Sequence, residues 1–200
     1  MKLLLFSDVH TDLEACRSLV ARSADADAVV CAGDLAAMRR GLQPVVDALS
    51  EIEVPTVLVA GNGESADELS AACDAAGWEA SHVLHGSGVE IEGIPFWGIG
   101  GGIPVTPFGP WSWDFSEEEA RELLAGCPEG GVLVSHSPPY GRVDTSGGEH
   151  LGSRALLDAV ERKQPRLVVC GHIHSCWEEE STVGSSRIVN AGPEGLLVEL

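Results

Sequence analysis

Six short apolar segments constrain the fold of this chain more than any other feature of its sequence. They read KLLLF, AVVCA, TVLVA, VLVS, RLVVC and RIVNA, and each has the length of a β-strand. Most are continuously apolar, a pattern typical of strands that are buried on both faces. Such strands form a sheet that other layers cover on both sides, most simply layers of helices.

Several of these segments are separated by stretches with helical periodicity. We expect helices over residues 13–22, 65–76, 116–125 and 153–162. Ser116 and Ser153 suit the N-cap position, and Ser116 together with Glu119 matches the capping-box pattern. Strands that alternate with helices predict an α/β fold, with one sheet between helical layers as the first model.

Length and composition predict one domain over residues 1–200. A chain of 200 residues with 44% apolar side chains can bury one substantial core. No apolar run has transmembrane length, and the start MKLLLFSDVH is too short in its apolar part for a signal peptide. The six cysteines lack C-x-x-C spacing, which favours free thiols in a reducing compartment. We therefore expect a soluble, cytoplasmic protein without a membrane partner.

Residues 100–114 are rich in Gly, Pro and Trp and lack periodicity, which predicts a long loop. If exposed, Phe108, Trp111 and Trp113 would suit a substrate lid or a subunit contact, and if buried they would form a satellite core. The sequence leaves these alternatives open. It also leaves the oligomeric state open, with a homo-oligomer as one alternative.

The charge of the chain restricts its partners. The formal net charge is −19, and only two of the twelve basic residues are lysines. This charge argues against a broad surface for duplex nucleic acid or for an anionic membrane. Any phosphate group that the protein binds must therefore meet a local source of positive charge.

Potential metal ligands follow five of the apolar segments. They are Asp8, His10, Asp34, Asn62, His136, His172 and His174. Ligands of open α/β sheets bind outside the carboxyl ends of the strands, so we expect these side chains to converge. Nitrogen and oxygen donors without sulfur suit Mn, Fe, Zn or Ni, and this set can hold two metals that share one carboxylate. Gly33, Gly61 and Gly171 precede three of the ligands and would let the backbone turn sharply.

The order D-x-H, G-D, G-N, H and G-H-x-H resembles the calcineurin-like metallophosphoesterase superfamily. The longer segments SHSPPYGRVD and IVNAGP resemble its Icc-related predicted phosphoesterase branch, and the resemblance spans essentially the whole chain. It implies a four-layer αββα sandwich, in which two central mixed β-sheets are flanked by helices, in place of the single sheet.

The resemblance also implies two divalent metal ions, with Mn favoured and Fe, Zn, Ni or Mg as alternatives. One metal would be held by Asp8, His10, Asp34 and His174, and the other by Asp34, Asn62, His136 and His172. A hydroxide between the metals would hydrolyse small phosphodiesters or nucleotide-like substrates, with Asp34, Asn62 and His136 also in catalytic roles. A phosphomonoesterase, a mononuclear zinc hydrolase and a non-catalytic interaction module on the same fold are the alternatives.

The sequence departs from the superfamily pattern at Gly63, where many members carry a histidine that protonates the leaving group or stabilises the transition state. Three explanations are open: a leaving group that needs no proton, another donor such as Glu64 or His150, or vestigial catalysis. Tyr140 and Arg142, in the Pro- and Gly-containing loop after the fourth ligand-bearing strand, are further candidates for substrate contact.

Four other residues are interpreted as structural. His82 and His85 match no motif and are expected to be ordinary surface or loop histidines. Cys176 lies near the last ligand in sequence but would be an unusual donor among carboxylates. Asn190 ends the last of the six apolar segments, and we expect it to support the ligands rather than to bind metal.

Overall fold

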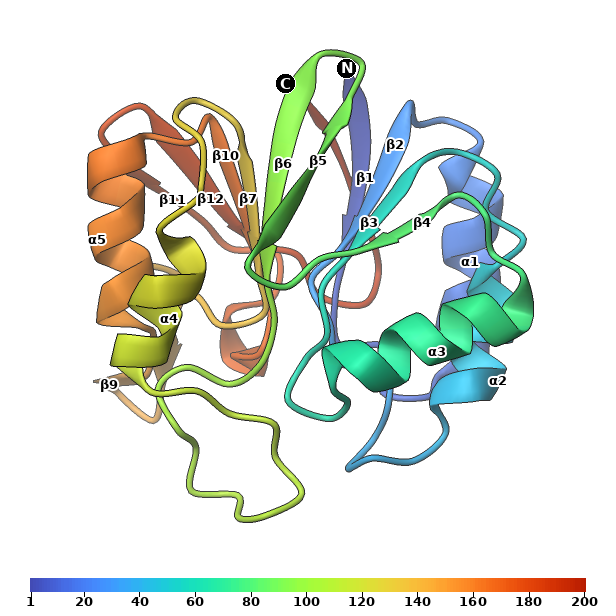
Figure 1. Cartoon of the computed structure of the whole chain (residues 1–200), viewed down its shortest axis with the longest axis horizontal. Coiled ribbons are helices and arrows are strands. Elements are labelled where there is room, and N and C mark those ends of the chain that lie inside the picture. Colours follow the sequence, from blue (N-terminus) through green and yellow to red (C-terminus); the bar gives the residue numbers. More distant parts are fainter.

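The computed structural model describes all residues from 1 to 200 and contains two β-sheets packed face to face (Figure 1). The first sheet has the order β13-β1-β2-β3-β4 and contains β1 (Lys2–Phe6), β2 (Ala28–Cys31), β3 (Thr56–Leu58), β4 (Ser81–Val83) and β13 (Leu196–Glu199). The second has the order β11-β12-β10-β7-β6-β5 and contains β5 (Ser87–Ile91), β6 (Ile94–Ile99), β7 (Val132–Ser135), β10 (Leu167–Cys170), β11 (Glu180–Val183) and β12 (Ser186–Asn190).

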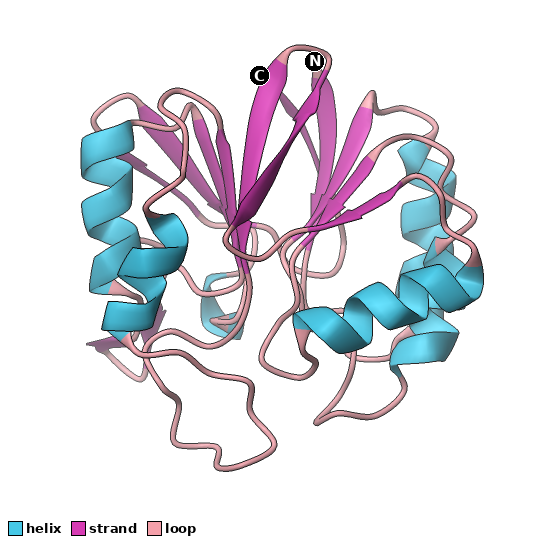
Figure 2. Cartoon of the chain, in the orientation of Figure 1, coloured by secondary structure: helices cyan, strands magenta, loops and turns pink.

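Helices cover the outer face of each sheet and complete four layers (Figure 2). The first sheet carries α1 (Leu13–Ser23), α2 (Leu42–Leu49) and α3 (Ala66–Ala76), and the second carries α4 (Glu117–Leu124) and α5 (Arg154–Lys163). Ser116 and Ser153 are the N-caps of α4 and α5, and Ser116 forms the predicted capping box with Glu119. A hairpin of β8 (Thr145–Ser146) and β9 (Glu149–His150) and a 3-10 turn, η1 (His174–Cys176), complete the structure.

The apolar strands are buried on both faces, as their continuous pattern predicts. In β1, Leu4 and Phe6 face the helices, whereas Leu3 and Leu5 face the second sheet and contribute to the core between the sheets. The layer that covers this second face is therefore another sheet. The first model of one sheet between helices is wrong, because burial of a strand face does not specify whether a helix or a sheet buries it.

The parallel strands bring their carboxyl ends to one edge of the molecule. Strands β1 to β4 are mutually parallel, and so are β6, β7, β10 and β12. Figure 1 shows both chain termini at one edge of the sheets and the loop of residues 100–114 at the opposite edge. No helix combines the length and the apolar character needed to cross a membrane.

Candidate metal centre

The seven candidate ligands converge where the two sheets meet. The first sheet supplies Asp8 and His10 after β1, Asp34 after β2 and Asn62 after β3, and the second supplies His136 after β7 and His172 and His174 after β10. Each follows the carboxyl end of a parallel strand, which is where open α/β sheets place their ligands. The site therefore depends on the packing of both sheets.

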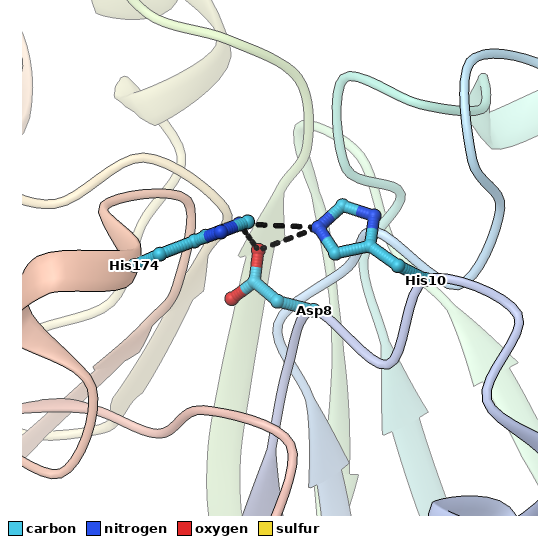
Figure 3. Close-up of side chains that lie close together, drawn as sticks. All are labelled: Asp8, His10 and His174. Carbon is cyan, nitrogen blue, oxygen red and sulfur yellow. Dashed lines mark hydrogen bonds and ion pairs between the residues drawn. The ribbon is translucent and has the colours of Figure 1, made fainter.

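A first cluster joins Asp8, His10 and His174 (Figure 3). The Nε2 atoms of His10 and His174 are 3.1 Å apart, and Asp8 Oδ1 lies 3.6 Å from His174 Nε2 and 3.9 Å from His10 Nε2. Two imidazole nitrogens and a carboxylate oxygen thus point at one small volume. A divalent cation in that volume would satisfy all three, and neutral imidazole is the commonest metal ligand in proteins.

A second cluster joins Asn62, His136 and His172. His136 Nε2 lies 3.1 Å from Asn62 Oδ1 and 3.1 Å from His172 Nδ1. Asp34 lies between the two clusters: its Oδ2 is 3.6 Å from His10 Nε2, and its Oδ1 is 3.5 Å from His136 Nε2. One carboxylate thus presents a different oxygen to each cluster.

Hydrogen bonds behind the ligands fix the orientation of the imidazoles. His136 Nδ1 lies 2.8 Å from Ala32 O, and His10 Nδ1 lies 3.3 Å from Ala36 O. A carbonyl oxygen only accepts, so Nδ1 carries a proton in both rings, and in the neutral form of each ring the Nε2 lone pair faces the cluster. His172 N donates to Asp8 Oδ1 at 3.1 Å, which ties a turn of the second sheet to a carboxylate of the first.

Four ligands lie on backbone of left-handed conformation. The φ angles of Asp8, His10, Asp34 and His172 are 55°, 42°, 56° and 67°. For residues other than glycine this conformation costs roughly 1–3 kcal/mol each, and it tends to gather at functional sites. The fold tolerates this strain at the positions that bring the ligands together.

The glycines before the ligands act in two ways. Gly33 has a φ of 93° and supplies the sharp turn expected before Asp34. Gly61 and Gly171 have no positive φ, so the expectation of a glycine-specific turn is wrong there. A Cβ at Gly61 would lie 2.0 Å from Asp34 Oδ1, and one at Gly171 would lie 2.4 Å from Asp8 Oδ2. These two glycines leave room for the carboxylates of their neighbours.

The electrostatics of the site favour an ionised Asp8 and a neutral His172. Burial by itself would raise the pKa of Asp8, but the hydrogen bond with His174 and the charge of His136 lower this pKa to about 2. Burial and the charge of His136 lower the pKa of His172 to about 3. Metal ligands bind in these forms, as carboxylate and neutral imidazole.

The donors present fit divalent metal ions. The donor atoms of Asp8, His10 and His174 all lie within 4.8 Å of one another, as do those of Asp8, Asp34 and His136. All donors in both clusters are nitrogen or oxygen, a set that suits Mn, Fe, Zn or Ni. Cys176 takes no part, because its thiol is buried and donates to Thr145 O.

A pocket of about 810 Å³ is lined by five of the seven candidate ligands: His10, Asp34, Asn62, His172 and His174. Tyr140 and His150, two of the predicted substrate or proton-donor residues, lie on its wall, together with Pro104, Val105, Phe108 and Trp111 of the loop. Arg142 is not on the wall, and its Nη1 donates to Gly141 O. Arg154, which the sequence did not single out, does line the pocket. Its only sequence signal is its place directly after the N-cap Ser153.

Glu64 lies outside the pocket wall. Only 1% of it is exposed, and its carboxylate accepts hydrogen bonds from the backbone of Gly61, Leu35 and Ala36 at 2.8, 3.2 and 2.9 Å. Burial and the charge of Asp34 raise the pKa of Glu64 to about 7. The structure does not support the prediction that Glu64 protonates a leaving group, because the Glu64 carboxylate does not reach the pocket. Glu64 instead fixes the loops that carry Asp34 and Asn62.

Position 63 has little room for the histidine found in many members of the superfamily. A Cβ on Gly63 would lie 2.9 Å from Ala36 O and 3.2 Å from Asp34 Oδ1. The backbone N–H of Gly63 also donates to Asp34 Oδ1 at 2.8 Å. Gly63 thus packs closely against Ala36 and Asp34, and a side chain at this position would disturb these contacts.

The loop of residues 100–114 is tied to the site. Asn62 Nδ2 donates to Ser112 Oγ at 2.9 Å, and Trp113 N donates to Asn62 O at 3.0 Å. Phe108 and Trp111 stack with ring centroids 5.6 Å apart, and Phe108 is half exposed. The loop of residues 100–114 therefore contacts Asn62 and also contributes Phe108 and Trp111 to the pocket wall.

Two residues expected to be structural have defined contacts. His85 is not a free surface residue: it packs on Trp113 and Phe115, and its Nδ1 accepts from Gly100 N at 3.2 Å. Asn190 is fully buried, and its Nδ2 donates to Gly171 O and Ile173 O at 3.2 and 3.1 Å. Asn190 thus supports the turn that carries the last two histidine ligands, as predicted.

A two-sheet α/β fold with nitrogen and oxygen donors where the sheets meet is that of a metallophosphoesterase domain. The family model of the calcineurin-like phosphoesterase superfamily domain matches residues 1–197, and the chain belongs to this superfamily. Both the two-sheet sandwich and the family resemblance seen in the sequence are confirmed.

Curated relatives share part of the chain. A UPF0046 protein of Caenorhabditis elegans is 35% identical over 108 residues, which cover 54% of this chain and 36% of that protein. The human metallophosphoesterase domain-containing protein 1 is 33% identical over 117 residues, which cover 54% of this chain and 33% of that protein. The matches thus span about a third of the length of these relatives.

Solved structures share the fold. The protein TT1561 of Thermus thermophilus has a TM-score of 0.79 and 21% identity, with 96% of this chain and 90% of that chain covered. A dimetal phosphatase from Danio rerio has a TM-score of 0.65 and 15% identity, with 96% and 88% covered. At these identities the likeness extends to the fold.

Proposed function

We propose that this protein is a phosphoesterase with a dinuclear metal centre that hydrolyses small phosphodiesters or nucleotide-like substrates. The observation that carries the proposal is the place of Asp34, which presents Oδ2 to His10 and Oδ1 to His136 at 3.6 and 3.5 Å. Paired metals that share a ligand are the arrangement that stabilises both the attacking and the leaving oxygen in phosphoryl displacement.

The two clusters divide the ligands between two metal positions. The first would be held by Asp8, His10, Asp34 and His174, and the second by Asp34, Asn62, His136 and His172. When bound, the two divalent ions supply an activated water and positive charge for the phosphate oxygens. We propose Mn²⁺ as the metal, and the same donors accommodate Fe, Zn or Ni. The positive charge of the two metal ions would allow a chain with a net charge of −19 to bind an anion.

His150 is our proposed proton donor for the leaving group, in place of the residue missing at Gly63. Asp144 is fully buried, and its Oδ1 lies 2.7 Å from His150 Nδ1. A buried carboxylate accepts only from a protonated Nδ1, which leaves Nε2 as the atom available to exchange a proton in the pocket. Unlike Glu64, His150 lines that pocket.

We base the proposed preference for a diester on the size and lining of the pocket. Its volume of about 810 Å³ is in the range of sites for whole small organic ligands. One wall carries Phe108, Trp111 and Val105, which suit an apolar or planar organic group on the phosphate. A phosphomonoester has one organic group in place of two and would fill less of this pocket. A non-catalytic module on the same fold would have no need of all seven ligands.

The cysteines support the proposed compartment. All six cysteines are free and buried, which is the state expected in a reducing environment. We therefore propose a cytoplasmic location.

Hydrolysis assays test the proposal. Metal-stripped protein is assayed with bis-p-nitrophenyl phosphate and with p-nitrophenyl phosphate, before and after addition of Mn²⁺, with Asp34→Asn as the control. We expect metal-dependent turnover, faster for the diester, that is lost in Asp34→Asn. Absence of turnover of both esters by folded, metal-loaded protein would contradict an esterase, and faster turnover of the monoester would contradict the diester preference.

A further inference from the structure

Arg154 is the one Lys or Arg side chain on the pocket wall. It is the first residue of α5, and its side chain is exposed. Its guanidinium forms no ion pair and no hydrogen bond within the chain, whereas Arg39 pairs with Glu68 and Arg187 with Glu180. The five N–H donors of Arg154 are therefore free to meet a ligand.

The aromatic ring of Tyr140 holds this guanidinium in place. The Cζ atom of Arg154 lies 3.9 Å from the centre of the Tyr140 ring, a cation–π contact. The same ring packs against His150 at a centroid distance of 5.6 Å. Stacking on an aromatic face uses the plane of the guanidinium and leaves the N–H groups at its edge for an oxyanion.

The wall that carries Tyr140 and Arg154 is preorganised by a buried carboxylate. Asp144 Oδ2 accepts from Gly141 N and Gly152 N at 2.8 and 2.9 Å, and Oδ1 holds His150. Tyr140 N donates to Ser153 O at 2.9 Å, which joins this loop to the start of α5. A charge that is already held in position loses less entropy when it binds a ligand.

Glu117 is an acidic residue at the start of α5, and its carboxylate is already hydrogen-bonded there. Its Oε2 accepts from Ser153 Oγ and Ala155 N at 2.8 and 2.7 Å, and its Oε1 accepts from Arg154 N at 2.8 Å. Glu117 thus caps the helix and forms no ion pair with the Arg154 guanidinium. Glu117 also lines the pocket, but its oxygens are directed at the helix start, so the Arg154 guanidinium has no ion-pair partner there.

We propose that Arg154 binds a second anionic group of the substrate, a phosphate or carboxylate on its organic part. The preferred substrates would be phosphoesters that carry such a group in addition to the phosphate at the metals. The planar fork of arginine suits both oxyanions, because each accepts two parallel N–H bonds. This inference rests on the proposed function, since it places the reacting phosphate at the metal ligands.

Three thymidine 5′-(4-nitrophenyl phosphate) substrates test the inference: one with a free 3′-hydroxyl, one with a 3′-phosphate and one with a 3′-succinyl ester. All three release 4-nitrophenol from the same phosphodiester, so the added anion is the main difference between them. The variants are Arg154→Gln, Arg154→Lys and, as a control on the same helix, Arg162→Gln, which is exposed and outside the pocket.

We expect the wild type to hydrolyse at least one of the substrates that carry an added anion with a higher kcat/KM than the substrate with the free 3′-hydroxyl. Arg154→Gln should reduce this advantage roughly 10- to 100-fold, the worth of a hydrogen bond to a charged group, and mainly through KM. Arg154→Lys should keep part of the advantage, and Arg162→Gln all of it. A gain for only one anionic substrate supports the inference and identifies the anion. Equal losses of Arg154→Gln on all three substrates would overturn it.

Failure of the proposed function is distinguished by binding. If none of the three esters is hydrolysed by metal-loaded protein, the proposed function fails, and the affinities for thymidine 3′,5′-bisphosphate and thymidine 5′-phosphate decide the inference. Tighter binding of the bisphosphate by wild type, lost in Arg154→Gln, supports it. Equal dissociation constants for the two nucleotides in wild type would overturn it.

Discussion

Asn62 donates a hydrogen bond from Nδ2 to Ser112 Oγ at 2.9 Å, while its Oδ1 faces His136 Nε2 at 3.1 Å. The hydrogen bond to Ser112 determines which end of the amide faces the second cluster. Ser112 Oγ in turn donates to Asp114 Oδ1 at 2.7 Å, so the chain of contacts runs from a candidate ligand into the loop of residues 100–114. The loop thus supports the candidate metal centre and also forms part of the pocket wall.

Ser112→Ala is therefore expected to weaken metal binding. Without its acceptor the Asn62 amide is free to rotate and present its NH₂ group to the cluster. Loss of a group that orients a metal ligand typically lowers affinity or activity about 10- to 100-fold. A Mn²⁺ titration followed by calorimetry measures the change. Thr106→Val is the matched control, because Thr106 bonds Ser112 and the same Asp114 but does not touch Asn62. Equal effects of both variants would assign the loss to the loop alone.

His150→Gln is expected to slow hydrolysis in proportion to the need for a proton on the leaving group. With methyl phenyl phosphate, whose leaving group is basic, kcat/KM should fall roughly 100-fold, within the usual contribution of a general acid. With methyl p-nitrophenyl phosphate the fall should be much smaller, because p-nitrophenolate leaves without protonation. His82→Gln, on β4, is the control. Equal losses on both esters would show that His150 does not act as the acid.

Gly63→His is not expected to restore a faster enzyme. The new Cβ would lie 2.9 Å from the carbonyl oxygen of Ala36, so the loop beside Asp34 must shift. We expect a loss of about 1–3 kcal/mol in the free energy of unfolding, as for other overpacked sites. Urea denaturation compares this variant with Gly63→Ala, which should show most of the same loss because it adds the same Cβ. A Gly63→His protein that is both stable and more active would contradict this account.

His85 is expected to make stability depend on pH. Burial against Trp113 and Phe115 lowers the pKa of His85 in the folded protein, whereas the unfolded chain has an ordinary value of about 6.5. The folded state therefore binds fewer protons, and the free energy of unfolding should decrease as the pH falls through about 6.5. Relative to His85→Asn, wild type should lose stability between about pH 8 and about pH 5.5. A difference between the two proteins that stays constant with pH would contradict this.

The sequence brings the candidate ligands to one place because each follows a strand. A parallel strand delivers whatever follows it to the same edge of the sheet, so Asp8, Asp34 and His172 could be grouped without coordinates. The helix that begins after Ser116 is also predictable from the sequence, because its capping box depends only on residues within one helical turn. These features depend on short-range pattern and on a general rule of α/β topology.

Other parts of the structure depend on tertiary packing. Helix α2 escaped prediction because it begins after Gly41 without a side-chain cap and carries Pro44 in its first turn. The direction of the Glu64 side chain is set by backbone N–H groups that come from two loops. Arg154 gains its place in the pocket by stacking on Tyr140, and no periodicity or motif encodes that contact.

The metal content of the protein tests the central claim most directly. Wild type, His10→Asn and His172→Asn are dialysed against excess Mn²⁺, checked for folding by circular dichroism and analysed by mass spectrometry for bound metal. We predict about two ions per wild-type chain and about one in each variant, because each substitution removes a ligand of a different cluster. One ion per wild-type chain, or a content that neither substitution changes, would contradict a dinuclear centre held by these residues.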